Sequence, residues 1–376
     1  MKNAAMTPDN PAPFPAPPRS LKELSPAVAR HCLRLERALL AHGLCRGHGL
    51  LLAVSGGADS TALAVLLSLL AARQGWRLHA CVIHHGLRPE ADAECGHVQG
   101  LCAALGMACH VRHAPVRALA RKAGTGLEES ARAARYALLE DVRQLTDCQW
   151  ILTGHQREDL CEDQLMRLVR GTGWPALGGM VDCDPQRRLL RPLLHVSGRT
   201  LRQWLTQWRI PWCEDSSNAD AAFLRNRLRH DLLPRLEAEN PAYGENASRL
   251  WRLAQVDAAY WEQTLDAALA VSPWQMGGGV ITLPRDLLRQ QPAAVRLRLY
   301  LRALRLLNRQ HGGQARAERL LALDAAWQAG RGNTRFQFPG GLMATLRAGA
   351  VTFAHAADDE GASPPAEDSG LPSRRG

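Results

Sequence analysis

A glycine-rich segment between an apolar run and a long helical pattern constrains the fold of this chain more than any other feature. Residues 50–54 are Leu-Leu-Leu-Ala-Val, which is typical of a strand buried on both faces of a parallel sheet. Residues 61–72 are rich in Leu and Ala, which favours a helix. The segment between them consists of Ser55, Gly56, Gly57, Ala58, Asp59 and Ser60. The order of strand, loop and helix predicts that the loop binds a phosphate at the helix start, with Ser60 as a candidate N-cap.

Asp59 sets this loop apart from the commoner nucleotide-binding loops. The segment lacks the Gly-Lys-Ser/Thr ending of a Walker loop and the spacing of a dinucleotide fingerprint. A carboxylate would repel a phosphate in direct contact, so we expect Asp59 to act through Mg²⁺. The pattern alone leaves open an ordinary Gly-Gly turn without a ligand.

Length, charge and cysteine content narrow the classes of protein. A chain of 376 residues favours two or more domains. The ten cysteines include no Cys-x-x-Cys pair, which argues against a zinc or iron–sulfur site. The chain shows neither the apolar core of a signal peptide nor an apolar stretch long enough to span a bilayer, so we expect a cytoplasmic protein without a membrane partner. The net charge of +10 favours a polyanionic partner, although an arginine-rich proteome would also produce it.

Strand and helix patterns alternate in the first part of the chain. After the strand at residues 50–54, further strands are expected near residues 78–83, 108–112 and 150–153, with helices near residues 91–105 and 128–145. This alternation predicts an α/β fold with a doubly wound parallel sheet, in which the ligand lies beyond the carboxyl ends of the strands.

The composition also predicts how the chain is divided. We expect a disordered proline-rich leader over residues 1–25, a catalytic domain over 26–220, a smaller and mainly helical domain over 221–355 and a disordered tail over 356–376. Within the helical domain, residues 336–342 indicate a turn between short strands, the second of which covers residues 343–353.

The pattern Ser-Gly-Gly-x-Asp-Ser after a buried strand resembles the pyrophosphate loop, or PP-loop, of the N-type ATP pyrophosphatases. Enzymes of that class cleave ATP between the α- and β-phosphates and transfer AMP to an oxygen. Several further segments resemble the tRNA(Ile)-lysidine synthetase family, in the order that this family shows them. The most discriminating is Arg-Leu-Val-Arg-Gly-Thr-Gly at residues 167–173, followed by Leu-Gly-Gly-Met at 177–180.

Two histidines are implied to border the ATP site. His85 lies in Ile-His-His-Gly-Leu-Arg at residues 83–88, and His155 opens the segment His-Gln-Arg-Glu-Asp at residues 155–159. For His85, a structural histidine that is hydrogen-bonded to a turn is an equal alternative.

A helix over residues 126–136 matches the family pattern Glu-x-x-x-Arg-x-x-Arg-Tyr. Glu128, Arg132, Arg135 and Tyr136 fall three or four residues apart and therefore share a face. Arginines on this face would neutralise charge as pyrophosphate departs, and the resemblance makes Arg132 a candidate catalytic residue. The alternative is a solvated face with Glu–Arg pairs.

An acidic cluster follows the expected strand at residues 150–153. Glu158, Asp159 and Glu162 correspond to family acids that hold Mg²⁺ or the ammonium group of substrate lysine. The resemblance therefore implies lysine binding by these three, a catalytic role for Asp159, and Mg²⁺ binding by Asp59 and Asp159. A carboxylate near the amine could also serve as its base. Glu158 replaces the aspartate that is usual there, and acids can also simply favour a helix N-terminus.

Arginines are the candidates for RNA binding. Residues 187–209 hold six arginines and no acid, and the planar guanidinium suits phosphate. The candidates from the family segments are Arg191, Arg225, Arg227 and Arg229.

Together these features predict a ligase that joins lysine to the wobble cytidine of a CAU anticodon through an adenylated tRNA. ATP and Mg²⁺ are the expected cofactors, and tRNA(Ile) and free L-lysine the expected partners. The alternatives are another PP-loop tRNA-modifying enzyme and a catalytically degenerate RNA-binding homologue. The sequence leaves the oligomeric state open, with a homodimer as one option.

Overall fold

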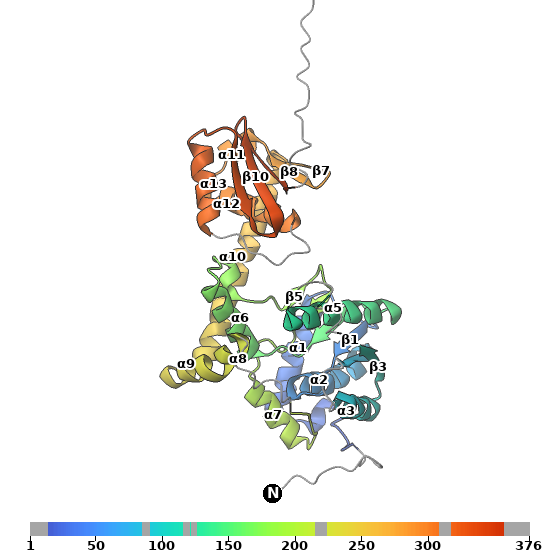
Figure 1. The fold of residues 1–376 in the computed structure, drawn as a ribbon. Coiled ribbons are helices and arrows are strands. Elements are labelled where there is room, and N and C mark those ends of the chain that lie inside the picture. The colour runs from blue at the N-terminus through green and yellow to red at the C-terminus, as the bar shows by residue number, and fades with distance from the viewer. Residues whose placement is uncertain are drawn as a thin grey trace, which may run out of the picture. The chain divides into compact units, whose positions relative to one another are not determined.

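The structure is a computed structural model that describes residues 14–84, 91–115, 121, 126–214, 224–307 and 317–356, with backbone only for 127–129. The chain forms two compact units (Figure 1). Unit 1 comprises Met1–Met166 and Gly179–Trp251, and unit 2 comprises Arg167–Gly178 and Arg252–Gly376. The sequence pattern predicts a domain boundary near residue 220. In the structure the chain passes from unit 1 to unit 2 between Trp251 and Arg252, inside α10 (Tyr243–Val271).

The described part of unit 1 contains a six-stranded sheet in the order β3-β2-β1-β4-β6-β5. Neighbouring strands run parallel except β5 and β6, which are antiparallel. The strands are β1 (Gly49–Ala53), β2 (Arg77–His84), β3 (Ala108–His113), β4 (Trp150–Thr153), β5 (Cys183–Asp184) and β6 (Leu189–Leu190). This sheet confirms the predicted α/β class.

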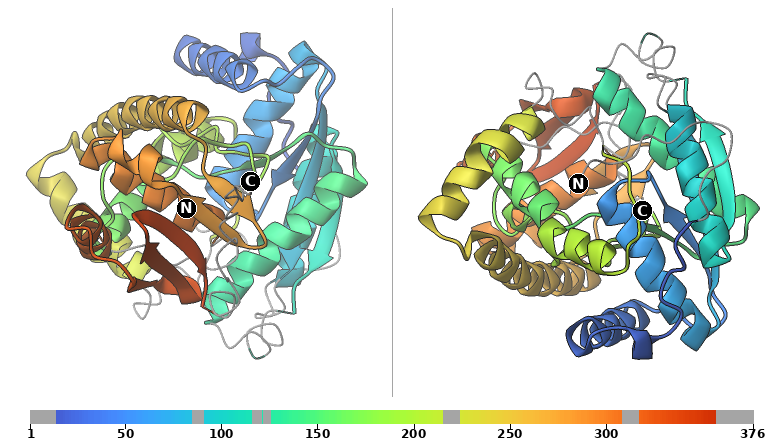
Figure 2. Two further views of the ribbon diagram at one scale, coloured as in Figure 1. Left: turned by 90° about the horizontal axis from the view of Figure 1, so that it is seen from above. Right: turned by 90° about the horizontal axis from the view of Figure 1, so that it is seen from below.

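Helices cover both faces of this sheet, as Figure 2 shows. On one face α2 (Ala58–Gln74) packs against α1 (Pro26–Ala41), α3 (Ala91–Leu105) and α7 (Gly198–Gln207). Because α2 is enclosed by the sheet and these helices, most of its residues are apolar and buried. On the other face lies α5 (Leu127–Leu145).

Because helices cover both faces of the sheet, the side chains of β1 alternate between two buried cores. Leu50 and Leu52 join the core on the α2 side, whereas Leu51 joins the core beneath α5 with Leu139 and Val142. A strand buried on both sides has no polar face, which is why its sequence is a continuous apolar run.

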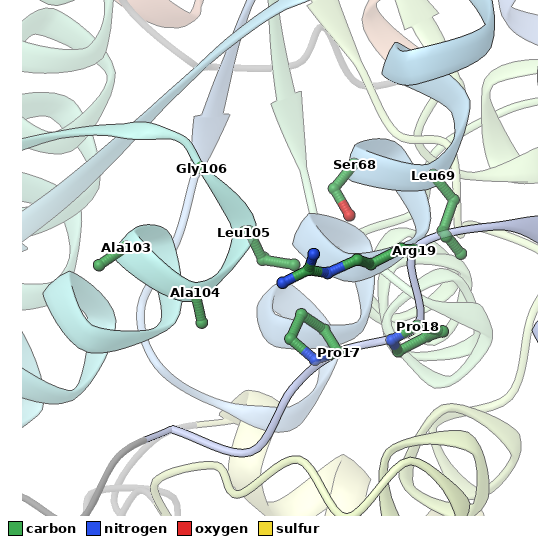
Figure 3. Close-up of a pocket in the computed structure, with 9 residues that line it drawn as sticks. All are labelled: Pro17, Pro18, Arg19, Ser68, Leu69, Ala103, Ala104, Leu105 and Gly106. Atoms are coloured by element: carbon green, nitrogen blue, oxygen red, sulfur yellow. The ribbon is translucent and has the colours of Figure 1, made fainter.

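Part of the expected leader lies against unit 1. Leu24 is buried next to the short helix η1 (Leu21–Glu23), and the ring of Phe14 packs edge-on to His97 with ring centroids 5.2 Å apart. A cavity of about 410 Å³ lies between this segment and the helices α2 and α3 (Figure 3). It is lined by Pro17, Pro18, Arg19, Ser68, Leu69, Ala103, Ala104, Leu105 and Gly106.

Helical segments complete unit 1. Helix α6 begins at Arg157 in unit 1 and ends at residue 169, which belongs to unit 2. Arg229 lies in the π-helical turn η4. The remaining elements of unit 1 are α6 (Arg157–Val169), whose last residues belong to unit 2, α8 (Leu224–Arg227), η4 (Leu228–Leu232) and α9 (Leu233–Glu239); η2 (Ala176–Gly178) belongs to unit 2. No helix in the described ranges is long and apolar enough to cross a membrane.

Unit 2 combines helices with a five-stranded antiparallel sheet in the order β7-β8-β11-β10-β9, counted over its described residues. Residues 343–353 form two strands rather than the single strand expected, because Ala348 and Gly349 turn the chain with positive φ values of 48° and 79°. A strand before the predicted turn is present as β9, whereas β7 and β8 were not predicted. The elements are β7 (Gln275–Gly277), β8 (Val280–Leu283), α11 (Arg285–Arg289), α12 (Ala293–Leu307), α13 (Ala317–Gln328), β9 (Thr334–Phe338), η5 (Pro339–Gly341), β10 (Leu342–Arg347) and β11 (Ala350–His355).

Candidate active site

The loop after β1 closes on the hydroxyl of Ser60. Ser60 Oγ accepts a hydrogen bond from Ser55 N and donates one to Gly57 O, each at 3.1 Å. Gly56 has a φ of 87°, a conformation that strains any side chain. Gly57 is the N-cap of α2, so the prediction that Ser60 is the N-cap is wrong: Ser60 lies in the first turn. The first N–H groups of α2, which have no acceptor within the helix, thus face the carboxyl edge of the sheet.

The end of β4 fixes the same loop from the side. A Cβ on Gly154, the residue after β4, would lie 2.9 Å from Ser60 N and 3.0 Å from the carbonyl carbon of Asp59. Cys213 N also donates a hydrogen bond to Gly56 O at 2.9 Å. Sequence analysis missed Gly154, although a glycine directly after an apolar strand signals a close backbone approach.

Asp59 is a carboxylate in the first turn of α2. Its Oδ1 is buried and has no hydrogen-bond partner in the described part of the chain. Burial raises the pKa of Asp59 to about 6; Asp159 and Glu158 add to this shift, while Arg202 and Arg229 oppose it. A buried carboxylate oxygen without a partner, beside other acids, is suited to binding a cation.

Two arginines hold the acidic cluster at the start of α6. Arg225 donates from Nη2 to Asp159 Oδ1 at 2.6 Å and from Nε to Glu162 Oε2 at 2.5 Å. Arg229 donates to the same two carboxylates, through Nη2 and Nε respectively. The Glu162 side chain is fully buried, and both of its oxygens accept from arginine. A buried acid at this position requires such compensation.

Asp159 and Glu158 also accept hydrogen bonds from the backbone, each from a different segment. Asp159 Oδ2 accepts a hydrogen bond from Gln156 N at 2.9 Å. Burial alone would raise the pKa of Asp159, but Arg225, the Gln156 N–H and Arg229 outweigh it and lower the pKa below its ordinary value. Glu158 Oε2 instead accepts from Gly198 N at 3.0 Å, at the start of α7.

His155 is neutral at physiological pH. Its Nδ1 lies 2.7 Å from Thr153 Oγ1. Burial lowers the pKa of His155 to about 3; Asp159 opposes this shift, whereas Arg191 and Arg135 reinforce it. The imidazole can therefore donate or accept a hydrogen bond beside the acidic cluster but adds no positive charge there.

The face of α5 carries the predicted arginines. Arg132 is exposed and Arg135 partly buried, and their Cζ atoms lie 5.4 Å and 5.8 Å from the centroid of the Tyr136 ring. Burial lowers the pKa of Arg135. The side chain of Glu128, expected on the same face, lies outside the described residues.

The candidate RNA-binding arginines occupy different environments. Arg191 is buried and donates from Nη1 to Val181 O at 2.6 Å, and Arg227 is exposed. Arg225 and Arg229 face carboxylates, as described above. His85, expected to border the ATP site, lies outside the described residues.

The Leu-Gly-Gly-Met segment packs against α6. Gly179 has a φ of 103°, and a Cβ there would lie 2.7 Å from Leu160 Cδ1 and 3.2 Å from Gln164 Cγ. Trp251 Nε1 donates to Met180 O at 2.8 Å. The segment thus supports the helix that carries Asp159.

Comparisons with known proteins agree with this geometry. The PP-loop domain family matches residues 30–236 of the chain. The tRNA(Ile)-lysidine synthase of Nitratidesulfovibrio vulgaris is 46% identical over 331 residues, covering 84% of this chain and 92% of that protein. The synthase of the same name from Geobacter sulfurreducens is 34% identical, covering 89% of this chain and 71% of that protein. A solved tRNA thiolase from Methanococcus maripaludis shares the fold with a TM-score of 0.50 at 16% identity, covering 61% of this chain and 78% of that one.

Proposed function

Because this chain belongs to the tRNA(Ile)-lysidine synthase family of PP-loop enzymes, we propose that the carboxyl edge of its sheet binds ATP, free lysine and a tRNA anticodon together. The enzyme is a ligase that forms a carbon–nitrogen bond. One observation carries the assignment of the site. Asp59, in the first turn of α2, lies close to Asp159 and Glu158 at the start of α6. The N-terminus of α2 suits a phosphate, and the acids at the start of α6 suit an ammonium group.

The proposed reaction has two steps. The C2 oxygen of the wobble cytidine attacks the α-phosphorus of ATP, and pyrophosphate leaves. The ε-amine of lysine then attacks C2, the C2–oxygen bond breaks, and AMP leaves with that oxygen. Adenylation makes the oxygen a good leaving group, and the amine loses its extra proton to a nearby base.

The loop would hold the pyrophosphate. Ser55, Gly56, Gly57, Ala58 and Ser60 place backbone N–H groups and hydroxyls at the N-terminus of α2, where the helix dipole favours negative charge. Arg132, exposed on α5, would approach the charge that develops on the departing phosphate.

The residues present fit Mg²⁺. Asp59 Oδ1 is buried without a partner among the described residues, and burial, with Asp159 and Glu158 nearby, raises the pKa of Asp59, so this oxygen would hold the ion. Asp159 is the second proposed ligand. No group of three or more His, Cys, Asp or Glu suited to a metal is found among the described residues, which agrees with an ion that also takes phosphate oxygens as ligands. Bound Mg²⁺ would neutralise charge on the phosphates.

The acidic cluster would bind lysine. Arg225 and Arg229 hold Asp159 and Glu162 in place through ion pairs, and Glu158 lies beside them on the first turn of α6. We propose that the ammonium group of lysine is recognised by these carboxylates, with Asp159 nearest the reacting amine, while neutral His155 contributes a hydrogen bond to ATP. The arginines would therefore fix the acids that bind the substrate.

The RNA partner would be tRNA(Ile) with a CAU anticodon. The net charge of +10 favours binding of a polyanion, and Arg227 is an exposed candidate for phosphate contact. Arg191, Arg225 and Arg229 are the other proposed RNA contacts; in the described conformation Arg191 is buried, and Arg225 and Arg229 pair with Asp159 and Glu162. We place the enzyme in the cytoplasm, where ATP, lysine and tRNA occur together.

A lysine-incorporation assay tests this function. Purified protein is incubated with ATP, Mg²⁺, labelled lysine and unmodified CAU-anticodon tRNA(Ile). We expect the label in the tRNA, with none when the wobble cytidine is replaced by uridine. Binding of tRNA without ATP-dependent incorporation would instead indicate a degenerate RNA-binding homologue.

A further inference from the structure

Guanidinium groups gather around Tyr136 on the α5 side of the sheet. Arg132, Arg135 and Arg187 place their Cζ atoms 5.4, 5.8 and 5.9 Å from the centroid of its ring. Arg191, directly after β6, also lies close enough for Tyr136 to act on its charge. Arg187 is exposed in the turn between β5 and β6 and belongs to none of the family segments.

In this cationic cluster no acid among the residues whose side chains are described forms an ion pair with Arg132, Arg135 or Arg191, although Asp159 and Asp184 act on the charges of Arg135 and Arg191. Asp184 approaches the cluster, with an oxygen 3.9 Å from Arg187 Nε, which is a weak and partly exposed contact. Two buried polar atoms that adjoin each other there, Arg191 Nε and the hydroxyl of Tyr136, have no partner at full hydrogen-bond geometry. Unpaired buried donors are costly, and so is concentrated positive charge. Both costs are relieved when an anion binds.

We propose that this cluster binds a phosphate group of the substrate RNA backbone. Rotation of the exposed side chains of Arg132 and Arg187 from the Tyr136 ring would open the hydroxyl to the phosphate, and paired N–H groups of the guanidinium match its oxygens. The inference rests on the function proposed above.

Within the cluster, Arg187 and Arg191 lie on the β6 side and separate this phosphate from those of ATP, which Arg132 would approach. The loop that would hold pyrophosphate follows β1, and the acidic cluster follows β4. Arg191 follows β6, which lies on the far side of β4 from β1 in the strand order. A polynucleotide that delivers its base to Asp159 extends beyond β4, whereas the phosphates of ATP stay at the N-terminus of α2.

The test uses Arg187→Ala, because this side chain is exposed and outside the proposed catalytic groups. Affinity for tRNA is measured across a salt series, and affinity for ATP is measured without tRNA. We expect tRNA affinity to fall about fivefold and the salt slope to decrease by about 1, with ATP affinity unchanged. Arg187→Lys should retain most of the salt slope. Arg37→Ala, an exposed arginine on α1 across the sheet from α5, is the matched control.

Tyr136→Phe provides a second, independent variant. Loss of the hydroxyl should weaken tRNA binding while thermal unfolding and ATP affinity stay near wild type. If both variants bind tRNA as the wild type does, or if ATP affinity falls instead, the inference is overturned. Wild-type protein that attaches no lysine would refute the proposed function, which is a separate outcome.

Discussion

Arg225 Nη2 donates a hydrogen bond to Asp159 Oδ1 at 2.6 Å and so joins α8 to the first turn of α6. The two residues are separated by 66 positions in the chain. Asp159 is nearly fully buried, and burial would favour its neutral form without this contact. The position of Asp159, one of the acids proposed to bind lysine, is therefore fixed by a distant helix as well as by its own.

Arg225→Ala should destabilise unit 1 by about 3 kcal/mol, because it leaves two buried carboxylates undercompensated. The KM for lysine should rise as Asp159 loses its fixed position. Denaturant unfolding and lysine kinetics measure the two effects. Arg227→Ala, on the same helix but exposed, is the matched control and should change stability much less. Equal effects of the two substitutions would contradict the role of the ion pair.

Asp59→Asn should stabilise the protein that lacks nucleotide and metal. The folded-state pKa of Asp59 is raised to about 6 from a usual 3.8, so ionisation opposes folding. This cost is absent below about pH 4 and complete above about pH 6. Replacement by Asn should thus add on the order of 1–2 kcal/mol at pH 7.5 and little at pH 4.

The same substitution should abolish pyrophosphate release while tRNA affinity stays near wild type. Urea unfolding at the two pH values and a pyrophosphate assay measure these effects. A variant that is less stable than wild type at pH 7.5, or that no longer binds tRNA, would contradict the assignment of Asp59 to Mg²⁺.

Gly154→Ala should weaken ATP binding at least tenfold. The new Cβ would lie 2.9 Å from Ser60 N, and this backbone atom cannot move without displacing the loop. Gly96→Ala in α3 is a suitable control, because a Cβ there meets nothing within 4 Å. Isothermal titration with ATP compares the two, and similar affinities would refute the close-approach argument.

Asp324→Ala should destabilise unit 2 without affecting ATP affinity. Asp324 accepts two hydrogen bonds from buried Arg296, at 2.7 and 2.8 Å, and one from Gln328 at 2.7 Å. Removing the carboxylate leaves a buried guanidinium and should cost about 3 kcal/mol. Asp266→Ala, which removes the exposed partner of Arg302, should cost less than about 1 kcal/mol.

Local signals in the sequence were sufficient for the strands β1 to β4 and for the loop, but not for β5 and β6, which have only two residues each. The apolar run of β1 and the helical run of α2 are each specified by neighbouring residues, and the glycine pair between them permits the tight turn of the loop, with Gly56 at a φ of 87°. The prediction of a single strand over residues 343–353 was wrong, because Ala348 and Gly349 both take a positive φ and turn the chain there. Alanine does not usually mark a turn, so the sequence contained no sign of it.

The pairing of side chains across the chain could not be predicted in the same way. Arg225 and Arg229 form a basic pattern that suggests RNA binding, yet their partners Asp159 and Glu162 are on another helix. Only the packing of α8 and η4 against α6 shows that these charges compensate one another.

A single-turnover experiment tests the central claim most directly. The enzyme is mixed with unmodified CAU-anticodon tRNA(Ile) and ATP labelled at the α-phosphorus, first without lysine and then with it. The account predicts that label enters the tRNA as pyrophosphate is released, and that adding lysine discharges it as AMP while lysine becomes attached to the wobble cytidine. Label that appears on lysine, or tRNA that never becomes labelled, would contradict it.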